Sequence, residues 1–390
     1  MITGDASYIK KINRSLIIKE IVNKGMISRA ELAKEVDLTR ATISVQVADL
    51  LEEGLVIETH LEHNAVGRKP IMLSLNAGAG YALGIDLDNK HITFIVTNLL
   101  GSIIAYENVL LHTNNYEEIV EILADNINRY GKQYNDTQYG IVGVCIAVHG
   151  LVGNDEIVHF VPQLGWNDVK LKTDLEKLIS LSIHIENNAN LSAFSERIFT
   201  HHDTENLLSA TFYSGIGLGM IMNNKFVRGH NGFAGEIGHM IIVPGGNECA
   251  CGNKGCWERY ASDQIIMDRL ADVKGVSELT YDQVAQWIDE NDEQVMEILK
   301  QFIFYVSIGL NNMINIYNPE VVVIDSELLQ LYPDATKAIH ENLHSKISHY
   351  RELSISKMGR KSCVLGACAL AIQQFLEVSV LNLPYEPVTS

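Results

Sequence analysis

The stretch that decides the fold lies between residues 235 and 258. It reads Gly235-Glu236-Ile237-Gly238-His239, and after nine further residues it continues Cys249-Ala250-Cys251 and then Cys256-Trp257-Glu258. Three thiols and one imidazole make up a ligand set that zinc takes in tetrahedral structural sites. The glycines between them permit the tight turns that bring four ligands to one ion. The spacing therefore predicts a zinc site; the alternative is buried thiols beside a hydrogen-bonded histidine.

Two carboxylates, Glu236 and Glu258, flank this ligand set. A closed zinc site with four protein ligands does not need them. We therefore expect them to face a polar ligand.

Composition places the chain among globular proteins. Its 390 residues are 47% hydrophobic and 20% charged, which allows sizeable cores and indicates two or three domains. The N-terminus carries no long apolar run, so we expect no signal peptide, and no segment is apolar for long enough to span a bilayer. Three of the six cysteines are clustered, which favours a reducing compartment. We expect a cytoplasmic protein with no membrane partner.

The net charge of −18 is unevenly distributed. Residues 1–75 contain ten basic and ten acidic residues and are neutral, so the whole excess of acid lies in the remainder of the chain. A strongly acidic surface repels nucleic acid. Only the N-terminal segment is therefore suited to DNA.

Three short helices are expected in that segment. The first covers Lys11 to Lys24 and is stopped by Gly25. The run Ser28-Arg29-Ala30-Glu31 fits a capping box and starts a second helix that ends at about Val36. Thr39 is expected to cap a third helix, whose apolar stripe comprises Ile43, Val47, Leu50 and Leu51.

Two short strands, Leu55-Val56-Ile57 and Ile71-Met72-Leu73, complete a winged helix-turn-helix. In that motif the third helix enters a major groove, where small and methyl-bearing side chains suit thymine. Basic side chains suit phosphates, or the minor groove when they lie in the wing. The predicted DNA-binding residues are Arg29, Thr39, Arg40, Ala41, Thr42, Ser44, Val45, Arg68 and Lys69. The alternative is a small helical interaction module with a solvated basic loop.

The rest of the chain repeats one pattern of strands followed by helices. The first series consists of strands at Tyr81–Leu87, His91–Asn98, Ser102–Val109, Ile141–Val148 and Ile183–Glu186, with helices at Tyr116–Tyr130 and from about Asn190. The second consists of strands at Ala210–Tyr213, Gly219–Asn223 and Val321–Asp325, with helices at Ser262–Ala271, Tyr281–Asp289, Asp292–Tyr317 and Cys363–Leu376. The repetition predicts two similar α/β lobes with a cleft between them.

In its order of motifs the chain resembles the ROK family of repressors and sugar kinases. The motifs that carry the resemblance are the two halves of the 235–258 stretch, the run Glu186-Asn187-Asn188-Ala189-Asn190 and the glycine loop Ser214-Gly215-Ile216-Gly217-Leu218-Gly219. The N-terminal winged helix resembles the repressor branch. The runs at 8–15 and 147–150 look most like xylose repressors of Gram-positive bacteria.

The resemblance implies a multidomain α/β protein, in which an N-terminal winged helix-turn-helix precedes a two-lobe, actin-like, sugar kinase-type body with a structural zinc. The expected domains are residues 1–76 for the DNA-binding head and 77–190 for the first lobe, with residues 371–390 packing on that lobe. Residues 191–370 are expected to form the second lobe, which carries the zinc loop.

The resemblance also implies the ligand-binding residues. Zinc would be held by His239, Cys249, Cys251 and Cys256. The sugar-binding residues would be Asn167, Asp168, Asn187, Asn188, Glu236, His239 and Glu258. Carboxylates and amides suit sugars because they form directed hydrogen bonds with hydroxyl groups. Trp166 and Trp257 are expected either to wall this site or to belong to ordinary core.

The pattern of the family's kinases is broken at three places. Asn188 stands where the kinases have the aspartate that accepts the proton of the sugar hydroxyl, and an amide cannot accept it. Asp88 stands in the early phosphate loop, where its charge would repel a triphosphate. Asp325-Ser326 stands after the late strand, where the family's kinases have a glycine pair on the adenine side of the nucleotide site. The glycine loop Ser214–Gly219 is retained, but a tight hairpin explains it equally well. Because of the three departures together, we expect neither binding of ATP nor catalysis.

We therefore expect a sugar-responsive repressor that binds a palindromic operator as a homodimer or a dimer of dimers. Its effector would be a monosaccharide bound between the lobes, with D-xylose favoured, although these residues do not distinguish a pentose from a hexose. Two rival hypotheses remain: a sugar kinase with an appended regulatory head, and a zinc-stabilised protein whose head binds another protein.

Overall fold

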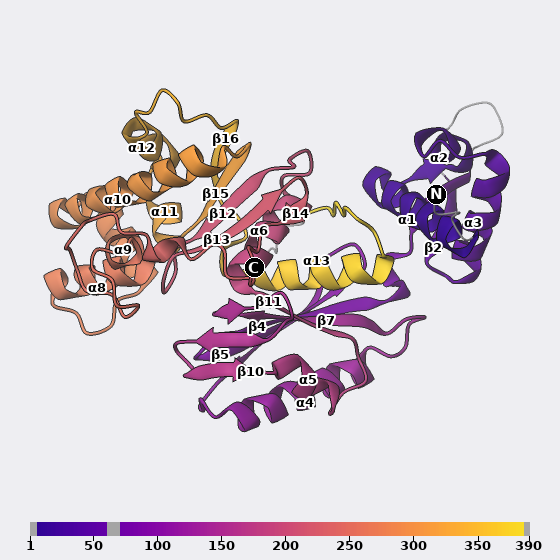
Figure 1. Ribbon diagram of the computed structural model, residues 1–390, viewed down its shortest axis with the longest axis horizontal. Helices are drawn as coiled ribbons and strands as arrows, with labels where there is room; N and C mark the ends of the chain where they lie inside the picture. The colour runs from indigo at the N-terminus through magenta and orange to yellow at the C-terminus, as the bar shows by residue number, and fades with distance from the viewer. Residues whose placement is uncertain (1–5, 61–70, 386–390) are drawn as a thin grey trace. The chain divides into compact units, whose positions relative to one another are not determined.

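A computed structural model of the chain describes residues 6–60 and 71–385. The helices and strands form an N-terminal winged helix-turn-helix followed by two α/β parts (Figure 1). By its internal contacts the chain divides into two compact units. Unit 1 comprises the residues up to Asn188, Ile198–His202 and the residues from Val364, and unit 2 comprises Ala189–Arg197 and Asp203–Cys363. Among the described residues, no helix is both long enough and apolar enough to cross a membrane.

The winged helix-turn-helix has the helices that its capping residues predict. Its elements are α1 (Ala6–Lys24), β1 (Ile27–Ser28), α2 (Arg29–Glu35), α3 (Arg40–Glu52), β2 (Val56–His60) and β3 (Ile71–Leu75). Ser28 and Glu31 form the predicted capping box of α2, and Thr39 caps α3 by accepting a hydrogen bond from the backbone N–H of Thr42. These caps satisfy N–H groups that a helix leaves unpaired at its start.

The predicted stripe of α3 forms part of the core of this head. Ile43, Val47 and Leu50 are fully buried, whereas Leu51 is half-buried. Two features differ from the expectation: α1 begins at Ala6 instead of Lys11, and the two-residue strand β1 pairs with β3. A strand of two residues is too short to give a periodic pattern.

The body of unit 1 is built on a mixed sheet in the order β11-β7-β4-β5-β6. Its strands are β4 (Tyr81–Leu87), β5 (His91–Asn98), β6 (Ile103–Leu110), β7 (Ile141–Val148) and β11 (Ile183–Asn187). Side chains alternate between the two faces of β4. Leu83, Ile85 and Leu87 enter the core beneath α4 (Tyr116–Gln133).

The opposite face of this sheet is covered by α13 (Ser362–Leu376) (Figure 1). A Cβ at Gly84 would lie 2.4 Å from the carbonyl oxygen of Val364, so α13 approaches β4 closely because this position has no side chain. A second sheet in the order β10-β9-β8 and the short helix α5 were not predicted. These elements are β8 (Leu151–Val152), β9 (Val158–Val161), β10 (Trp166–Val169) and α5 (Leu171–Glu176).

Unit 2 repeats the sheet of unit 1 with the same connectivity, in the order β14-β13-β12-β15-β16. The strands are β12 (Leu207–Thr211), β13 (Gly217–Met222), β14 (Lys225–Phe226), β15 (Val321–Asp325) and β16 (Glu352–Ile355). Counted along the chain, the first three strands of each sheet pair antiparallel with one another. The fourth and fifth strands along the chain run parallel to the first. The predicted repetition of the two lobes is therefore present in the topology, and the glycine loop is the predicted β12–β13 hairpin.

Helices cover both faces of the second sheet. On one face, α6 (Asn188–Phe199) packs so closely that a Cβ at Gly219 would lie 2.1 Å from the carbonyl oxygen of Ala189. The other helices of the unit are α7 (Glu258–Ala261), α8 (Asp263–Lys274), α9 (Tyr281–Asp289), α10 (Glu293–Tyr317), α11 (Glu327–Leu331) and α12 (Ala335–Asn342). Both tryptophans named above belong to cores: Trp166 is 4% exposed and Trp257 is fully buried.

Trp257 fixes α7 to α10. The indole N–H of Trp257 donates to the carbonyl oxygen of Tyr305 at 2.9 Å. A Cβ at Gly309 would lie only 2.2 Å from the Trp257 ring, so the ring packs against α10 where this helix has no side chain. Because Glu258 directly follows Trp257 in the chain, these contacts also anchor the end of the segment from Gly235 to Glu258.

Candidate functional site

The segment from Gly235 to Glu258 is closed into a compact loop by backbone hydrogen bonds at its two ends. The N–H of Trp257 donates to the carbonyl oxygen of Met240 at 2.8 Å, and the N–H of Ile242 donates to that of Gly255 at 2.9 Å. Gly255 has a positive φ of 89°, and a Cβ at this position would lie 1.8 Å from the carbonyl oxygen of Val243. Only glycine fits this turn.

The closed loop brings the four predicted ligands together. The ligand atoms of His239, Cys249, Cys251 and Cys256 all lie within 4.8 Å of one another. Cys251 Sγ is 3.6 Å from Cys256 Sγ, and Cys249 Sγ is 3.6 Å from His239 Nδ1. Zinc–sulfur bonds of about 2.3 Å in a tetrahedron place two sulfurs about 3.8 Å apart, so the four groups fit a zinc ion. The cluster can therefore bind a metal, and its donor set suits zinc.

Two of the thiols lie in the protein interior. Cys249 is 8% exposed and Cys256 is fully buried, whereas Cys251 is exposed. Burial raises the pKa of the Cys249 thiol to about 12. The Cys249 thiol donates a hydrogen bond to Glu258 Oε1 at 3.1 Å.

Glu258 lies against the ligand cluster itself. Its Oε1 is 3.4 Å from His239 Nδ1, and its Oε2 lies 3.2 Å from the position of a Cβ at either Gly215 or Gly238. The glycine loop between β12 and β13 therefore leaves room for this carboxylate. Glu236 is exposed at the start of the 3₁₀ helix Ile237–His239. Because an imidazole has two nitrogens, His239 can bind a metal through one and a second ligand through the other.

The remaining predicted sugar-binding residues belong to unit 1. Asn187 ends β11 and Asn188 begins α6. The side-chain amide of Asn187 donates to the carbonyl oxygen of Gly150 at 2.9 Å, which fixes its orientation. On β10, the amide of Asn167 donates to the carbonyl oxygen of Gly165 at 3.3 Å.

Asp168 has a partner that the sequence did not suggest. Its Oδ1 lies 2.7 Å from His159 Nδ1, while 76% of its side chain is exposed. A second such pair joins Asp86 Oδ1 at the end of β4 to His149 Nε2 after β7, also at 2.7 Å. No local pattern could have found this pair, because 63 residues separate its members.

The candidate DNA-binding surface is the outward face of α3. Thr39, Arg40, Ala41, Ser44 and Val45 are exposed, and Val45 is 60% exposed. Thr42 is half-buried, and its hydroxyl lies 2.9 Å from that of Thr39.

Two basic groups of the predicted set differ in their surroundings. Arg29 Nη1 lies 2.7 Å from Glu58 Oε1, so a phosphate would have to compete with this carboxylate. Arg40 forms no ion pair with any described residue. The predicted wing residues Arg68 and Lys69 lie outside the described residues.

Comparisons with known proteins match both parts of the chain. A family model described as the ROK family matches residues 82–374, and a model described as winged helix-turn-helix DNA-binding matches residues 12–57. The chain is 34% identical over 382 residues to a protein named xylose repressor from Bacillus subtilis (strain 168), and this match covers 96% of the chain and 98% of that protein.

Two solved structures show the same architecture. A ROK family transcriptional regulator, described as a homolog of the E. coli MLC protein, superimposes with a TM-score of 0.81 at 26% identity and covers 95% of this chain and 97% of its own. A ROK family glucokinase from Streptomyces griseus, in complex with glucose and AMPPNP, gives a TM-score of 0.66 at 23% identity. It covers 75% of this chain and 100% of its own, and it shows the fold of the body alone.

Proposed function

Since the chain belongs to the ROK family, as its motifs predict, we propose that it is a sugar-responsive transcriptional repressor. The observation that carries this proposal is the winged helix-turn-helix, which precedes a body that matches the ROK family over residues 82–374 and presents an exposed face of α3. The xylose repressor from Bacillus subtilis matches both parts together, over 96% of the chain. Operator DNA is therefore the proposed partner of the head.

A structural zinc is proposed for the loop in unit 2. His239, Cys249, Cys251 and Cys256 would hold it, and the ion would supply the cross-link that fixes this glycine-rich loop. Glu236 and Glu258 stand within or next to the loop, so a fixed loop would present both carboxylates in constant positions.

The proposed effector is a monosaccharide, with D-xylose favoured by the names of the relatives. The proposed sugar-binding residues remain Asn167, Asp168, Asn187 and Asn188 in unit 1 and Glu236, His239 and Glu258 in unit 2. Their amides, imidazole and carboxylates provide hydrogen-bond donors and acceptors for hydroxyl groups.

We also propose that the body binds sugar without phosphorylating it. Asn188 offers no base, and in unit 1 the Asp86 carboxylate is engaged by His149. In unit 2, Asp325 at the end of β15 accepts a hydrogen bond of 2.6 Å from the Tyr213 hydroxyl. A buried carboxyl group at Asp325, on the side of the body where the family's kinases hold adenine, disfavours the binding of a nucleotide.

The test is an electrophoretic mobility shift on the upstream region of the protein's own gene, at one fixed salt concentration. A shifted band that D-xylose abolishes, and that glucose and N-acetylglucosamine leave in place, is the expected result. Absence of any shift under all sugar conditions would contradict the repressor function. Sugar-dependent formation of ADP would instead favour the kinase hypothesis.

Replacement of Glu236 by alanine is expected to remove the response to sugar and to leave operator binding intact. Glu236 is exposed beside the proposed zinc ligand His239, so its loss removes a carboxylate from the sugar site without leaving a cavity. Hydrogen bonds to a charged group contribute about 1.5–3 kcal/mol each, so sugar affinity should fall at least tenfold. Isothermal titration calorimetry measures this, with Glu248→Ala as the matched control on the same loop. Equal sugar affinity in both variants would place the sugar site elsewhere.

Asp325 predicts a dependence of stability on pH. The residue is 1% exposed, and its Oδ2 has no hydrogen-bond partner among the described residues. Burial is the main cause that raises the pKa of Asp325 from 3.8 to about 7, and the nearby carboxylates Glu196 and Glu327 add to it. The hydrogen bond from Tyr213 and the charge of Arg360 act in the opposite direction. A raised pKa in the folded state means that stability falls as the pH rises from about 4 to about 7.

The neutral variant Asp325→Asn should escape this loss. Its stability relative to the wild type is expected to increase by about 2 kcal/mol between pH 5.5 and pH 8.5. Thermal unfolding of both proteins at the two pH values measures the difference, with zinc and salt held constant. A difference that does not change with pH would show that Asp325 is already ionised in the folded protein.

A further inference from the structure

The end of α13 contacts the DNA-binding head, and both belong to unit 1. Glu377, the first residue after this helix, forms two hydrogen bonds with α1. Its carboxylate accepts one from the Lys11 ammonium group at 2.8 Å, and its carbonyl oxygen accepts one from the Ser15 hydroxyl at 2.7 Å. Lys11 and Ser15 are one helical turn apart, so they share a face of α1. A single residue of the body therefore contacts one face of a helix of the head.

Glu377 also has an unusual backbone conformation for its residue type. Its φ is positive, at 53°, and its N–H donates to the carbonyl oxygen of Gln374 at 3.2 Å, so it ends α13 with a left-handed turn. Glycine is the usual residue in this conformation at the end of a helix, because it has no Cβ. Glutamate is less favourable for the backbone, but its carboxylate provides the contact with Lys11.

A second contact joins the same end of α13 to α3. The Tyr139 ring packs edge-on against the Phe375 ring of α13, with the ring centroids 5.0 Å apart. The Tyr139 hydroxyl donates to the carbonyl oxygen of Glu53 at 3.0 Å. Glu53 is the C-terminal cap of α3, and its carboxylate accepts hydrogen bonds of 2.6 and 3.1 Å from Arg14 of α1. The end of α13 is thus connected to both helices, including the one that carries the candidate DNA-binding surface.

A series of contacts leads from a proposed sugar-binding residue to the strands beneath α13. The side-chain amide of Asn187 donates to the carbonyl oxygen of Gly150 at 2.9 Å. His149 precedes Gly150 in the chain and is paired with Asp86 at the end of β4. A ligand that moves Asn187 therefore acts on the ends of both β7 and β4.

These two strands carry α13. A Cβ at Gly84 of β4 would lie 2.4 Å from the carbonyl oxygen of Val364, and a Cβ at Gly143 of β7 would lie 3.5 Å from the Cβ of Ala371. Surfaces packed this closely move together, because no free space separates them. A displacement of the strand ends is therefore passed to the helix.

We propose that α13 transmits the occupancy of the sugar site to the DNA-binding head, and that Glu377 is the residue through which it acts on α1. This inference rests on the proposed function, since it requires that sugar alters operator binding. The pair of Lys11 and Glu377 is exposed, so it contributes little to stability. Its effect is on orientation: two heads fit a palindromic operator only when each is held at a suitable angle to its body.

The first test removes the Glu377 side chain and keeps its backbone conformation. Glu377→Gly suits the positive φ, so the variant should keep about the thermal midpoint of the wild type. In mobility shifts at one salt concentration, D-xylose is expected to lower the operator affinity of the wild type at least about tenfold and that of the variant less than about threefold. Calorimetry should show the same D-xylose affinity for both proteins.

The matched control is Asp334→Gly at the start of α12 in unit 2. Asp334 also has a φ of 53°, so the control replaces a carboxylate by glycine in the same backbone conformation. It should respond to D-xylose like the wild type. A Glu377→Gly variant that releases the operator as strongly as this control would overturn the proposal.

The second test exchanges the two charges. Glu377→Lys should weaken the sugar response, and the double variant Lys11→Glu, Glu377→Lys should restore it. The response is the ratio of operator affinities without and with D-xylose, so a general loss of DNA binding cancels. Lys10→Glu is the control for charge on α1, because Lys10 pairs with Asp49 inside the head at 2.7 Å, and it should keep the response. A double variant no better than Glu377→Lys would contradict the proposed role of the pair.

Hydrogen–deuterium exchange tests the same route without DNA. D-xylose is expected to change the exchange of the α1 amides in the wild type and in Asp334→Gly, and to leave them unchanged in Glu377→Gly. Unchanged exchange in α1 of the wild type, with sugar bound, would overturn the proposal. Absence of operator binding by the wild type would instead contradict the repressor function, and the exchange measurement would still decide whether α13 connects the sugar site to the head.

Discussion

Replacement of Val45 by glutamate is expected to abolish operator binding. Val45 is 60% exposed on α3 and so contributes little to the core of the head. A methyl-bearing side chain on a recognition helix contacts thymine methyl groups, and loss of a good base contact costs about 1–3 kcal/mol. The new carboxylate would in addition be repelled by the phosphates. For two heads on a palindrome we expect at least about a hundredfold loss of affinity.

The control for this variant is Met26→Glu, which adds the same charge to the head. Met26 is 47% exposed and lies in the turn between α1 and β1. Mobility shifts at one salt concentration should show strong binding by the control and none by Val45→Glu, while both retain the sugar affinity of the wild type. Equal operator affinity in the two variants would mean that another surface contacts the DNA.

Replacement of Cys251 by serine is expected to remove the metal. Cys251 is the exposed member of the four proposed ligands, so the substitution would change the donor set with little effect on packing. A hydroxyl is a much poorer zinc ligand than a thiolate, because zinc favours sulfur in such sites. We expect the zinc content to fall from one ion per chain to almost none, with a lower thermal midpoint and weaker sugar binding.

Elemental analysis of the purified protein measures the zinc directly and does not depend on its activity. The control is Cys145→Ser, which alters a fully buried thiol on β7 in unit 1. That variant should lose stability and keep its zinc. A wild type without zinc, or a Cys251→Ser variant that retains a full complement, would contradict the proposed metal site.

The two substitutions should therefore have separate effects. Val45→Glu acts on the head and should spare sugar binding, whereas Cys251→Ser acts on the loop beside Glu258 and should spare operator binding in the absence of sugar. This separation is what the proposed repressor requires, because recognition of DNA and recognition of sugar lie in different parts of the chain.

Much of this protein is determined by its sequence over short distances. Strands β4, β5, β7 and β15 have the predicted boundaries, and the start of α3 follows from its Thr39 cap. The clustering of the four proposed metal ligands was also predicted from spacing, because these residues lie within one loop whose glycines leave few ways to close it. Caps, periodicity and loop closure act over a few residues, so a single sequence contains them.

Other features depend on contacts between distant residues. Asp86 meets His149 and Tyr213 meets Asp325 across 63 and 112 positions. The pairing of Arg29 with Glu58 likewise follows only from the way the head folds. The strands β1 and β8–β10 are too short for a pattern and exist because neighbouring strands provide their hydrogen bonds.

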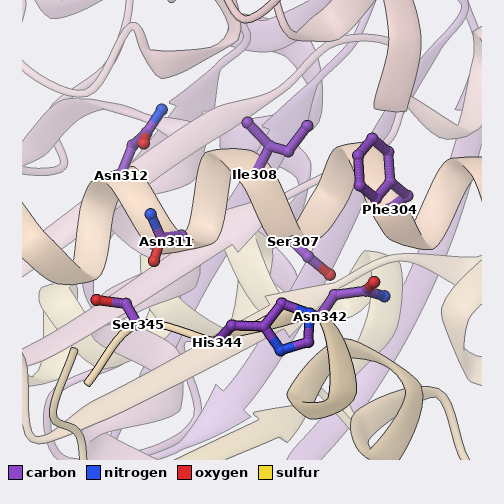
Figure 2. Close-up of a pocket in the computed structure, with 8 residues that line it drawn as sticks. All are labelled: Phe304, Ser307, Ile308, Asn311, Asn312, Asn342, His344 and Ser345. Atoms are coloured by element: carbon purple, nitrogen blue, oxygen red, sulfur yellow. The ribbon is translucent and has the colours of Figure 1, made fainter. Parts of the chain in front are cut away.

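The second half of α10 in unit 2 combines both kinds of information. The sequence by itself determines that α10 carries no charge from Gln301 to Tyr317, and a wholly buried helix would account for that equally well. Only the tertiary structure leaves Phe304 and Ile316 exposed and places the end of α12 and the segment after it alongside α10 to form a groove (Figure 2). The reason is physical: periodicity specifies which residues share a face of a helix, whereas packing between distant elements decides whether that face is covered.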